Sequence, residues 1–178
     1  DTDHCQITFF VPGTEQTVAL MNGAAPGPGD LFAWCGSSAV KNCALSRGDA
    51  TPDGSIPLKM TVTGPGPHII SYNKPQWNLV PAHSGQRWTV SVDVRANMGT
   101  NIELSIFGAD AFGNVFGDAQ DYAFGNFMIT TEWTTVSFSH TFTNAAVEYI
   151  QCRLDGPSAV GTSVFWKRLH VVPTTVLA

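Results

Sequence analysis

The stretch Gly85-Gln-Arg-Trp-Thr-Val-Ser-Val-Asp-Val-Arg95 decides the fold class of this chain. Its apolar residues, Trp88, Val90, Val92 and Val94, alternate with polar residues. An extended strand sends successive side chains to opposite faces of a sheet, so this period of two predicts a strand with one buried and one polar face. Val, Thr and Trp also suit a pleated, half-buried surface.

Similar short strands are predicted along the rest of the chain, separated by turn residues. They are expected at Gln6–Val11, Gln16–Leu20, Leu58–Val62, His68–Tyr72, Trp77–Val80, Asn101–Ile106, Phe127–Thr131, Thr134–Thr143, Val147–Asp155 and Ser163–Val172. Only 13% of the residues are charged, and the chain contains 17 Gly and 11 Pro, which suits many strands joined by turns. We therefore expect an all-β protein, with residues 1–178 forming a single antiparallel β-sandwich of the jelly-roll type.

The charge and the acidic residues exclude several classes of function. A net charge of −5 argues against a nucleic-acid partner, which would need clustered Lys and Arg. No apolar run approaches the length of a membrane span, so no membrane insertion is expected. A glycosidase needs two facing carboxylates about 5–10 Å apart. The glutamates are scattered along the chain, at Glu15, Glu103, Glu132 and Glu148, and we expect no enzymatic activity.

Four cysteines allow three disulfide pairings, which the sequence cannot rank fully. Cys35 and Cys43 flank a polar loop that could close on itself, and we expect this bridge. A second bridge between Cys5 and Cys152 is conditional on the first. The alternative is four free thiols in a reducing compartment, with Cys152 buried as a small apolar residue.

Three short motifs resemble those of the jelly-roll carbohydrate-binding modules attached to xylanases and β-glucanases. Val80–Ser91 resembles a strand of these modules, Thr130–Phe138 resembles a second, and Tyr149–Gly156 followed by Val164-Phe165-Trp166 resembles their closing strands. The likeness covers about residues 48–172, and residues 1–47 are expected to extend the same domain. The same pattern, with an upstream stretch like Ala50–Ser55, also occurs in modules of phage tail and virion proteins.

The resemblance bears on calcium as well as on glycan binding. Members of the family often hold a structural calcium with acidic residues just after the apolar pair of the final strand. Here Lys167 and Arg168 stand at those positions, which argues against that metal site. A separate group of oxygen ligands in a Gly-rich loop could hold calcium, although its spacing fits no known ligand loop: Asp110, Asn114, Asp118 and Asp121. No other cofactor is expected.

The candidate binding residues lie on the polar face of a predicted strand. Tyr149, Gln151 and Arg153 alternate with the apolar residues of the same strand. A sugar ring packs its C–H face on an aromatic side chain, and its hydroxyls bond to amide and guanidinium groups. An ordinary solvated face is the alternative. Asp93 would add a hydrogen-bond acceptor and a partner for Arg153 if it lay on the same sheet.

Further candidates come from two loops. Trp77, with Tyr72 nearby, follows a turn and could be an exposed platform for a sugar ring. The segment Gly108–Gly125 is read as a long loop whose aromatic residues either fold back on the sandwich or form a contact between subunits: Phe112, Phe116, Tyr122 and Phe124. The first outcome favours a monomer and the second favours a homo-oligomer.

Two hypotheses of function follow from these observations. The first is a non-catalytic, secreted module that binds a polysaccharide or oligosaccharide. The second is a structural or assembly protein with the same fold, on a virion or another extracellular surface. The placement of the aromatic residues between Gly108 and Gly125 is expected to separate the two hypotheses.

Overall fold

The computed structural model describes residues 5–7, 10–11, 14–15, 18–20, 42–65, 69–71, 80–112, 114–116 and 121–174. Within this set, the side chains of residues 5–20, 69–71, 80 and 151 are not described. In the described part of the chain, no helix is long and apolar enough to cross a bilayer.

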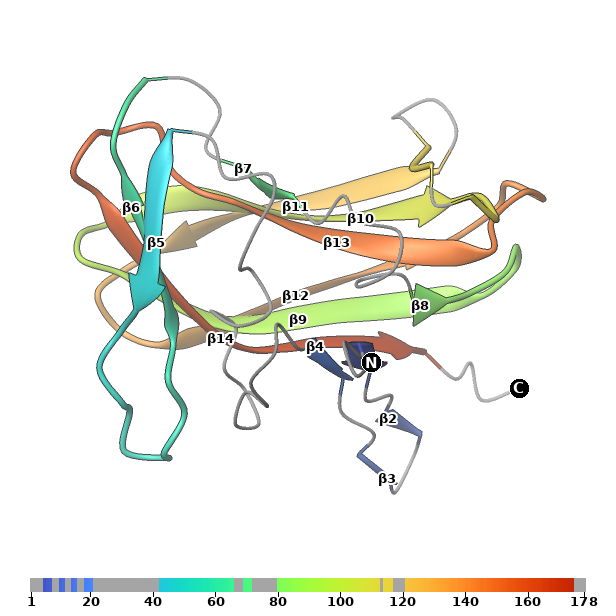
Figure 1. Ribbon diagram of the computed structural model, residues 1–178, viewed down its shortest axis with the longest axis horizontal. Helices are drawn as coiled ribbons and strands as arrows, with labels where there is room; N and C mark the ends of the chain where they lie inside the picture. The colour runs from blue at the N-terminus through green and yellow to red at the C-terminus, as the bar shows by residue number, and fades with distance from the viewer. Residues whose placement is uncertain are drawn as a thin grey trace, which may run out of the picture.

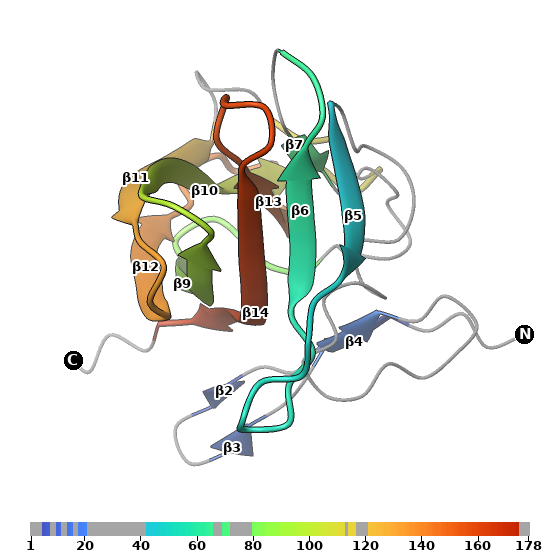
Figure 2. The same cartoon turned by 90° about the vertical axis from the view of Figure 1, so that its left-hand side faces the viewer.

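Two five-stranded antiparallel sheets lie face to face (Figures 1 and 2). The first sheet has the order β11 (Tyr122–Ile129), β10 (Thr100–Ala109), β13 (Tyr149–Asp155) and β7 (Ile69–Ser71), with β8 (Val80–Pro81) also pairing with β13. The second sheet has the order β12 (Thr134–Thr141), β9 (Arg87–Ala96), β14 (Ser163–Pro173), β6 (Leu58–Val62) and β5 (Cys43–Arg47). This architecture confirms the predicted all-β sandwich.

Two short hairpins lie outside the two sheets. In one, β1 (Cys5–Ile7) pairs with β4 (Val18–Leu20), and in the other β2 (Phe10–Val11) pairs with β3 (Thr14–Glu15). The strands β1 and β2 fall at the predicted strand Gln6–Val11, and β4 falls at the predicted strand Gln16–Leu20, whereas β3 lies between the two predicted strands.

The core lies between the sheets and is made by the alternation that the sequence showed. The apolar residues of β9 are at most 2% exposed: Trp88, Val90, Val92, Val94 and Ala96. Those of β10 and β13 that belong to the same cluster are at most 4% exposed: Ile102, Leu104, Ile106, Ile150, Cys152 and Leu154. Because inner and outer residues alternate along each strand, the burial of these side chains fixes which residues point outward.

The predicted loop Gly108–Gly125 is shorter than expected, because the two glycines at its ends lie in strands. A Cβ at Gly108 would lie 2.8 Å from Cγ2 of Val147, and a Cβ at Gly125 would lie 2.7 Å from the ring of Phe127. These glycines therefore allow close packing within a sheet. The strand β11 begins at Tyr122 rather than at the predicted Phe127, so two aromatic residues assigned to the loop are strand residues.

The edge strand β5 was not predicted. It contains a single large aliphatic residue, Leu45, which is half-buried against the core. An edge strand with one large, half-buried aliphatic side chain shows little alternation of apolar and polar residues. The sequence pattern therefore indicated only the turn that follows β5.

The cysteine predictions have different outcomes. Cys152 is a buried free thiol, and burial raises its pKa. The bridge to Cys5 is therefore absent from this structure, because Cys152 belongs to the apolar core facing β9. Cys35 lies outside the described residues, so its bridge to Cys43 stays a prediction.

A buried carboxylate holds the end of the β10–β11 connection against the end of β12. The side chain of Asp121 is 2% exposed and lies 2.6 Å from Nε2 of His140. It also accepts hydrogen bonds from the backbone N–H groups of Thr143 and Asn144, at 2.7 and 2.8 Å. Asp121 was one of four possible calcium ligands in the sequence, but its oxygens bond to groups of the chain itself.

We expect Asp121→Ala to lower the free energy of unfolding by about 2–4 kcal/mol, because it leaves two backbone N–H groups without their charged acceptor. Asp110→Ala is the matched control. Asp110 also accepts hydrogen bonds from backbone N–H groups, of Phe112 and Asn114, but in an exposed loop, so its loss should cost less than about 1 kcal/mol. Urea unfolding of both variants measures the difference, and equal losses would contradict this account.

Candidate functional site

The outer face of the first sheet carries the residues best suited to bind a ligand. The pairing of β10 with its two neighbours places Glu103 opposite Asp155, Ser105 opposite Arg153 and Phe107 opposite Tyr122. Eight of the described residues on this face lie close to Arg153 or along the same strands: Glu103, Ser105, Phe107, Tyr122, Phe124, Tyr149, Arg153 and Asp155. We refer to them as the outer-face site.

Three aromatic rings form a continuous row across the site. The ring centroids of Phe107 and Tyr122 lie 4.5 Å apart with an interplanar angle of 32°. Those of Tyr122 and Phe124 lie 5.5 Å apart with an angle of 28°. Phe107 is 8% exposed and Phe124 is 51% exposed, so the row runs from a buried end to an open one. An open aromatic ring offers a surface for the C–H face of a sugar.

Arg153 connects the aromatic row to two carboxylates. Its Cζ lies 4.9 Å from the centroid of the Phe107 ring. Its Nε donates a hydrogen bond to Oδ2 of Asp155 at 3.0 Å, and its Nη2 lies 4.0 Å from Oε1 of Glu103. These contacts hold the guanidinium over the ring, and they engage its charge with groups of the protein.

Glu103 accepts hydrogen bonds from two hydroxyl groups of the site. Its Oε1 accepts hydrogen bonds from the Tyr122 hydroxyl at 3.0 Å and from Oγ of Ser105 at 3.3 Å. Burial raises the pKa of Tyr122 to about 12, and its hydrogen bond to Glu103 adds to the rise. Tyr122 therefore remains a neutral hydrogen-bond donor at physiological pH.

Asp155 has an unusual carboxyl group. Burial raises its pKa to about 6, the positive charge of Arg153 opposes the rise, and the negative charge of Glu103 adds to it. Its Oδ1 is buried and has no hydrogen-bond partner among the described residues. A buried acceptor without a donor is uncommon in folded proteins, and it marks this carboxyl group as an unusual feature of the outer-face site.

The predicted site residues divide into three groups. Tyr149 and Arg153 lie on one outward face, as predicted. The side chain of Gln151, together with Tyr72 and Trp77, lies outside the described residues. Asp93 does not join them, because β9 belongs to the second sheet. It bonds to Arg168 and Thr135, and the carboxylate partner of Arg153 is Asp155 instead.

Most of the residues around Arg153 were not predicted from the sequence. Glu103 was expected to be one of several scattered glutamates, whereas the register places Asp155 directly opposite it. The signal was present in β10, where the alternation that buries Ile102, Leu104 and Ile106 turns Glu103, Ser105 and Phe107 outward. The pairing of β10 with β13 could not be read from that alternation alone.

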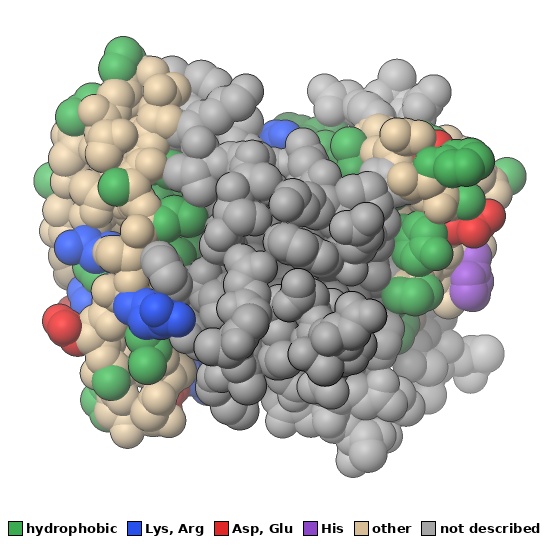
Figure 3. Space-filling view, in the orientation of Figure 1, with side chains coloured by type: hydrophobic (Ala, Val, Ile, Leu, Met, Phe, Trp, Pro, Cys, Tyr) green, Lys and Arg blue, Asp and Glu red, His purple; other side chains and the backbone are tan. Residues whose placement is uncertain are grey.

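The aromatic residues of the predicted long loop lie in three different places in the structure. Tyr122 and Phe124 belong to the aromatic row, and Phe116 packs against the core. Phe112 is 81% exposed in the segment after β10, and Val115 nearby is 41% exposed. Figure 3 shows hydrophobic side chains gathered at the right-hand end of the molecule in this view.

The described residues offer no centre for a metal ion. No group of three or more His, Cys, Asp or Glu side chains among them is arranged to hold a metal. Of the four loop residues considered for calcium, Asp110 accepts hydrogen bonds from the backbone and from Nδ2 of Asn114, and Asp121 bonds to His140. Asp118 lies outside the described residues.

Solved structures of other proteins share this fold. The CBM22-1 xylan-binding domain of Paenibacillus barcinonensis Xyn10C aligns with 78% of this chain and 86% of its own, at 9% identity and a TM-score of 0.51. A family 16 carbohydrate-binding module aligns with 72% of this chain and 84% of its own, at 14% identity and a TM-score of 0.50.

A third similar structure is the enzymatically active domain of tailspike protein 4 from bacteriophage CBA120. It aligns with 77% of this chain at 12% identity and a TM-score of 0.55, but the alignment spans only 18% of the tailspike chain. No protein-family model and no curated protein sequence matches this chain. The chain therefore has the β-sandwich fold of these carbohydrate-binding modules, which is also found in part of a phage tailspike.

Proposed function

We propose that this protein binds a glycan at the outer-face site and performs no catalysis on it. The observation that carries the proposal is the aromatic row ending at Phe124, which lies beside Arg153 and two carboxylates on the same sheet. Such a row provides apolar contact for a sugar ring. The carboxylates, the guanidinium and the Tyr122 hydroxyl provide directional hydrogen bonds to sugar hydroxyls.

The arrangement of the carboxylates supports binding rather than hydrolysis. Glu103 and Asp155 lie directly opposite each other on neighbouring strands, and both face Arg153. Hydrolysis would need one carboxyl group on each side of a glycosidic bond, with the bond between them. Two carboxyl groups on one sheet face, held by the same guanidinium, instead form a single patch of hydrogen-bond acceptors.

The proposal includes the residues that the sequence predicted on β13 and the expected setting of the protein. Tyr149 extends the outer-face site toward the end of β10, since it lies opposite Ala109. Gln151 is included from its place in the alternation of β13. The proposed partner is a polysaccharide or oligosaccharide outside the cell, and the similar CBM22-1 domain is described as xylan-binding.

A second function, assembly into a homo-oligomer of a virion or another extracellular surface, is favoured by one observation. Phe112 is 81% exposed, and a large exposed aromatic side chain commonly marks a contact surface. The similarity to part of a phage tailspike is compatible with this alternative.

A glycan array followed by calorimetry tests the proposed function. We expect Phe124→Ala to weaken binding by about 5- to 30-fold, which corresponds to about 1–2 kcal/mol of lost ring contact. Phe112→Ala is the matched control, because it removes an exposed ring outside the row and should leave the affinity unchanged. If wild type binds no glycan and Phe112→Ala dissociates an oligomer in sedimentation measurements, assembly is the function instead.

The affinity should rise as the pH increases from 5 to 7. Above its pKa of about 6, Asp155 is a carboxylate, and its hydrogen bond from Arg153 holds the guanidinium in place at the outer-face site more strongly than a neutral acid would. We expect about a 5-fold gain in wild type, from about 1 kcal/mol in this hydrogen bond. Asp155→Asn should bind weakly at both pH values. A wild-type affinity that does not change over this interval would remove Asp155 from the binding site.

A further inference from the structure

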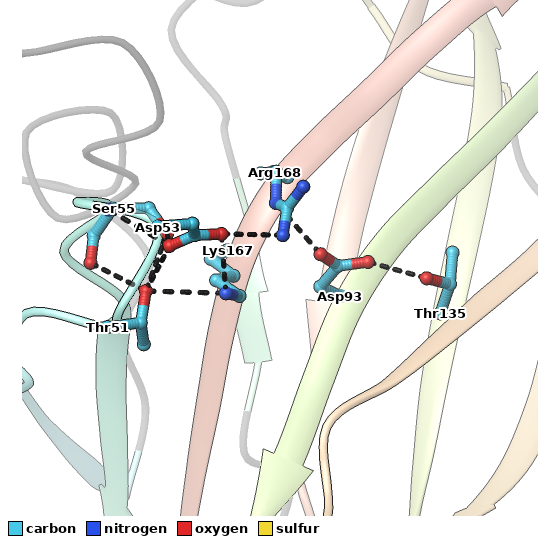
Figure 4. Close-up of polar contacts among 7 residues, drawn as sticks. All are labelled: Thr51, Asp53, Ser55, Asp93, Thr135, Lys167 and Arg168. Atoms are coloured by element: carbon cyan, nitrogen blue, oxygen red, sulfur yellow. Dashed lines mark hydrogen bonds and ion pairs between the residues drawn. The ribbon is translucent and has the colours of Figure 1, made fainter.

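A turn on the second sheet forms a compact set of oxygen atoms around one carboxylate. Oδ1 of Asp53 accepts hydrogen bonds from the backbone N–H of Ser55 at 3.1 Å and from its hydroxyl at 2.6 Å (Figure 4). The Thr51 hydroxyl bonds to the same Oδ1. Oxygen atoms of carboxylates, hydroxyls and carbonyls gathered in this way are the ligands that calcium prefers.

An ammonium group lies against two of these side chains. Nζ of Lys167 lies 2.9 Å from Oδ2 of Asp53 and 3.3 Å from Oγ1 of Thr51. It also lies 4.6 Å from the centroid of the Trp133 ring. The Lys167 side chain is only 6% exposed, so its charge is buried and needs these partners.

A guanidinium group occupies the other side of the same carboxylate. Nη2 of Arg168 lies 2.6 Å from Oδ2 of Asp53, and its Nε lies 2.9 Å from Oδ2 of Asp93. Asp93 in turn accepts a hydrogen bond from the Thr135 hydroxyl at 2.6 Å. Arg168 therefore connects the turn to β9, and through Asp93 to β12 (Figure 4).

The backbone of β14 is distorted so that both cations reach Asp53. Consecutive residues of a regular strand point to opposite faces, which would direct Lys167 and Arg168 away from each other. Here the register of β14 against β9 shifts between Lys167 and His170, and Arg168 has a φ of 50°. A left-handed conformation is unfavourable for a residue with a Cβ, so the contacts that it permits must compensate.

We propose that Lys167 and Arg168 take the structural role of a bound cation, so that this turn is joined to the sandwich without a metal ion. The calcium site implied by the resemblance does not fit these residues. A divalent ion beside Asp53 would meet two positive groups within hydrogen-bonding distance of the same oxygen. The oxygens of the turn remain, but two covalently attached cations lie against Oδ2 of Asp53.

The protonation of Asp53 agrees with this arrangement. The hydrogen bonds from Ser55 and Thr51, with the contact to Lys167, hold the pKa of Asp53 well below its usual range. A carboxyl group with a lowered pKa stabilises the fold above its unfolded pKa of 3.8, and this contribution is lost as the pH falls below that value. Asp53 is therefore ionised at neutral pH, where its negative charge faces the two cations.

Thermal unfolding in calcium chloride and in EDTA tests the proposal. We expect the Tm of wild type to be equal in both, since no metal contributes. Lys167→Met should lower the Tm by about 5 °C or more, because it removes the ammonium group that contacts Oδ2 of Asp53. Lys59→Met is the matched control, since Lys59 lies over the Phe165 ring with no carboxylate partner among the described residues, and it should change the Tm by less than about 2 °C.

A charge reversal gives a second, independent readout. Lys167→Asp removes the ammonium and adds a carboxylate, so its Tm should rise by several degrees in calcium chloride relative to EDTA. A wild-type Tm that rises with calcium would overturn the proposal, as would equal Tm losses in Lys167→Met and Lys59→Met. A folded Lys167→Asp variant that shows no response to calcium would overturn the assignment of these oxygens as a cation site.

Discussion

The burial of one apolar face from each sheet is the constraint on which the rest of this structure depends. Strand β9 places five apolar side chains against the facing sheet, and each is at most 2% exposed. Apolar area removed from water contributes about 25 cal/mol per Å², so the packed interface is the main source of stability. Once the inner residues are fixed, every intervening residue must point outward. The outer-face site follows from that geometry, whereas the cluster around Asp53 also needs the register shift in β14 that lets Lys167 and Arg168 reach one carboxylate.

The two outer faces use the same kinds of side chain for different purposes. On the first sheet, Arg153 lies over Phe107 between two carboxylates, but Oδ1 of Asp155 has no hydrogen-bond partner among the described residues, and the ring of Phe124 is open. On the second sheet, Asp53 is surrounded by hydroxyls and two cations. The first arrangement retains bonding capacity for a ligand, whereas the second uses its capacity within the protein.

The fold could be predicted from the sequence because it depends on local alternation, which strands such as β9, β6 and β13 show clearly. The site could be predicted only in part, because it depends on which strands are neighbours. Alternation placed Tyr149 and Arg153 outward, but it could not show that β10 supplies Glu103 and Phe107 beside them, or that Asp93 lies on the other sheet. The glycines at 108 and 125 were read as loop residues because close packing and turns favour glycine equally.

The central claim is that the outer face of the first sheet is where this protein binds a glycan. Nuclear magnetic resonance of the isotope-labelled protein, titrated with an oligosaccharide that it binds, tests this claim most directly. The account predicts that the largest amide shifts fall on β10, β11 and β13, around Glu103, Phe124 and Arg153, while the amides of β9 and β14 stay unchanged. Shifts concentrated on the second sheet, with none on these three strands, would contradict it.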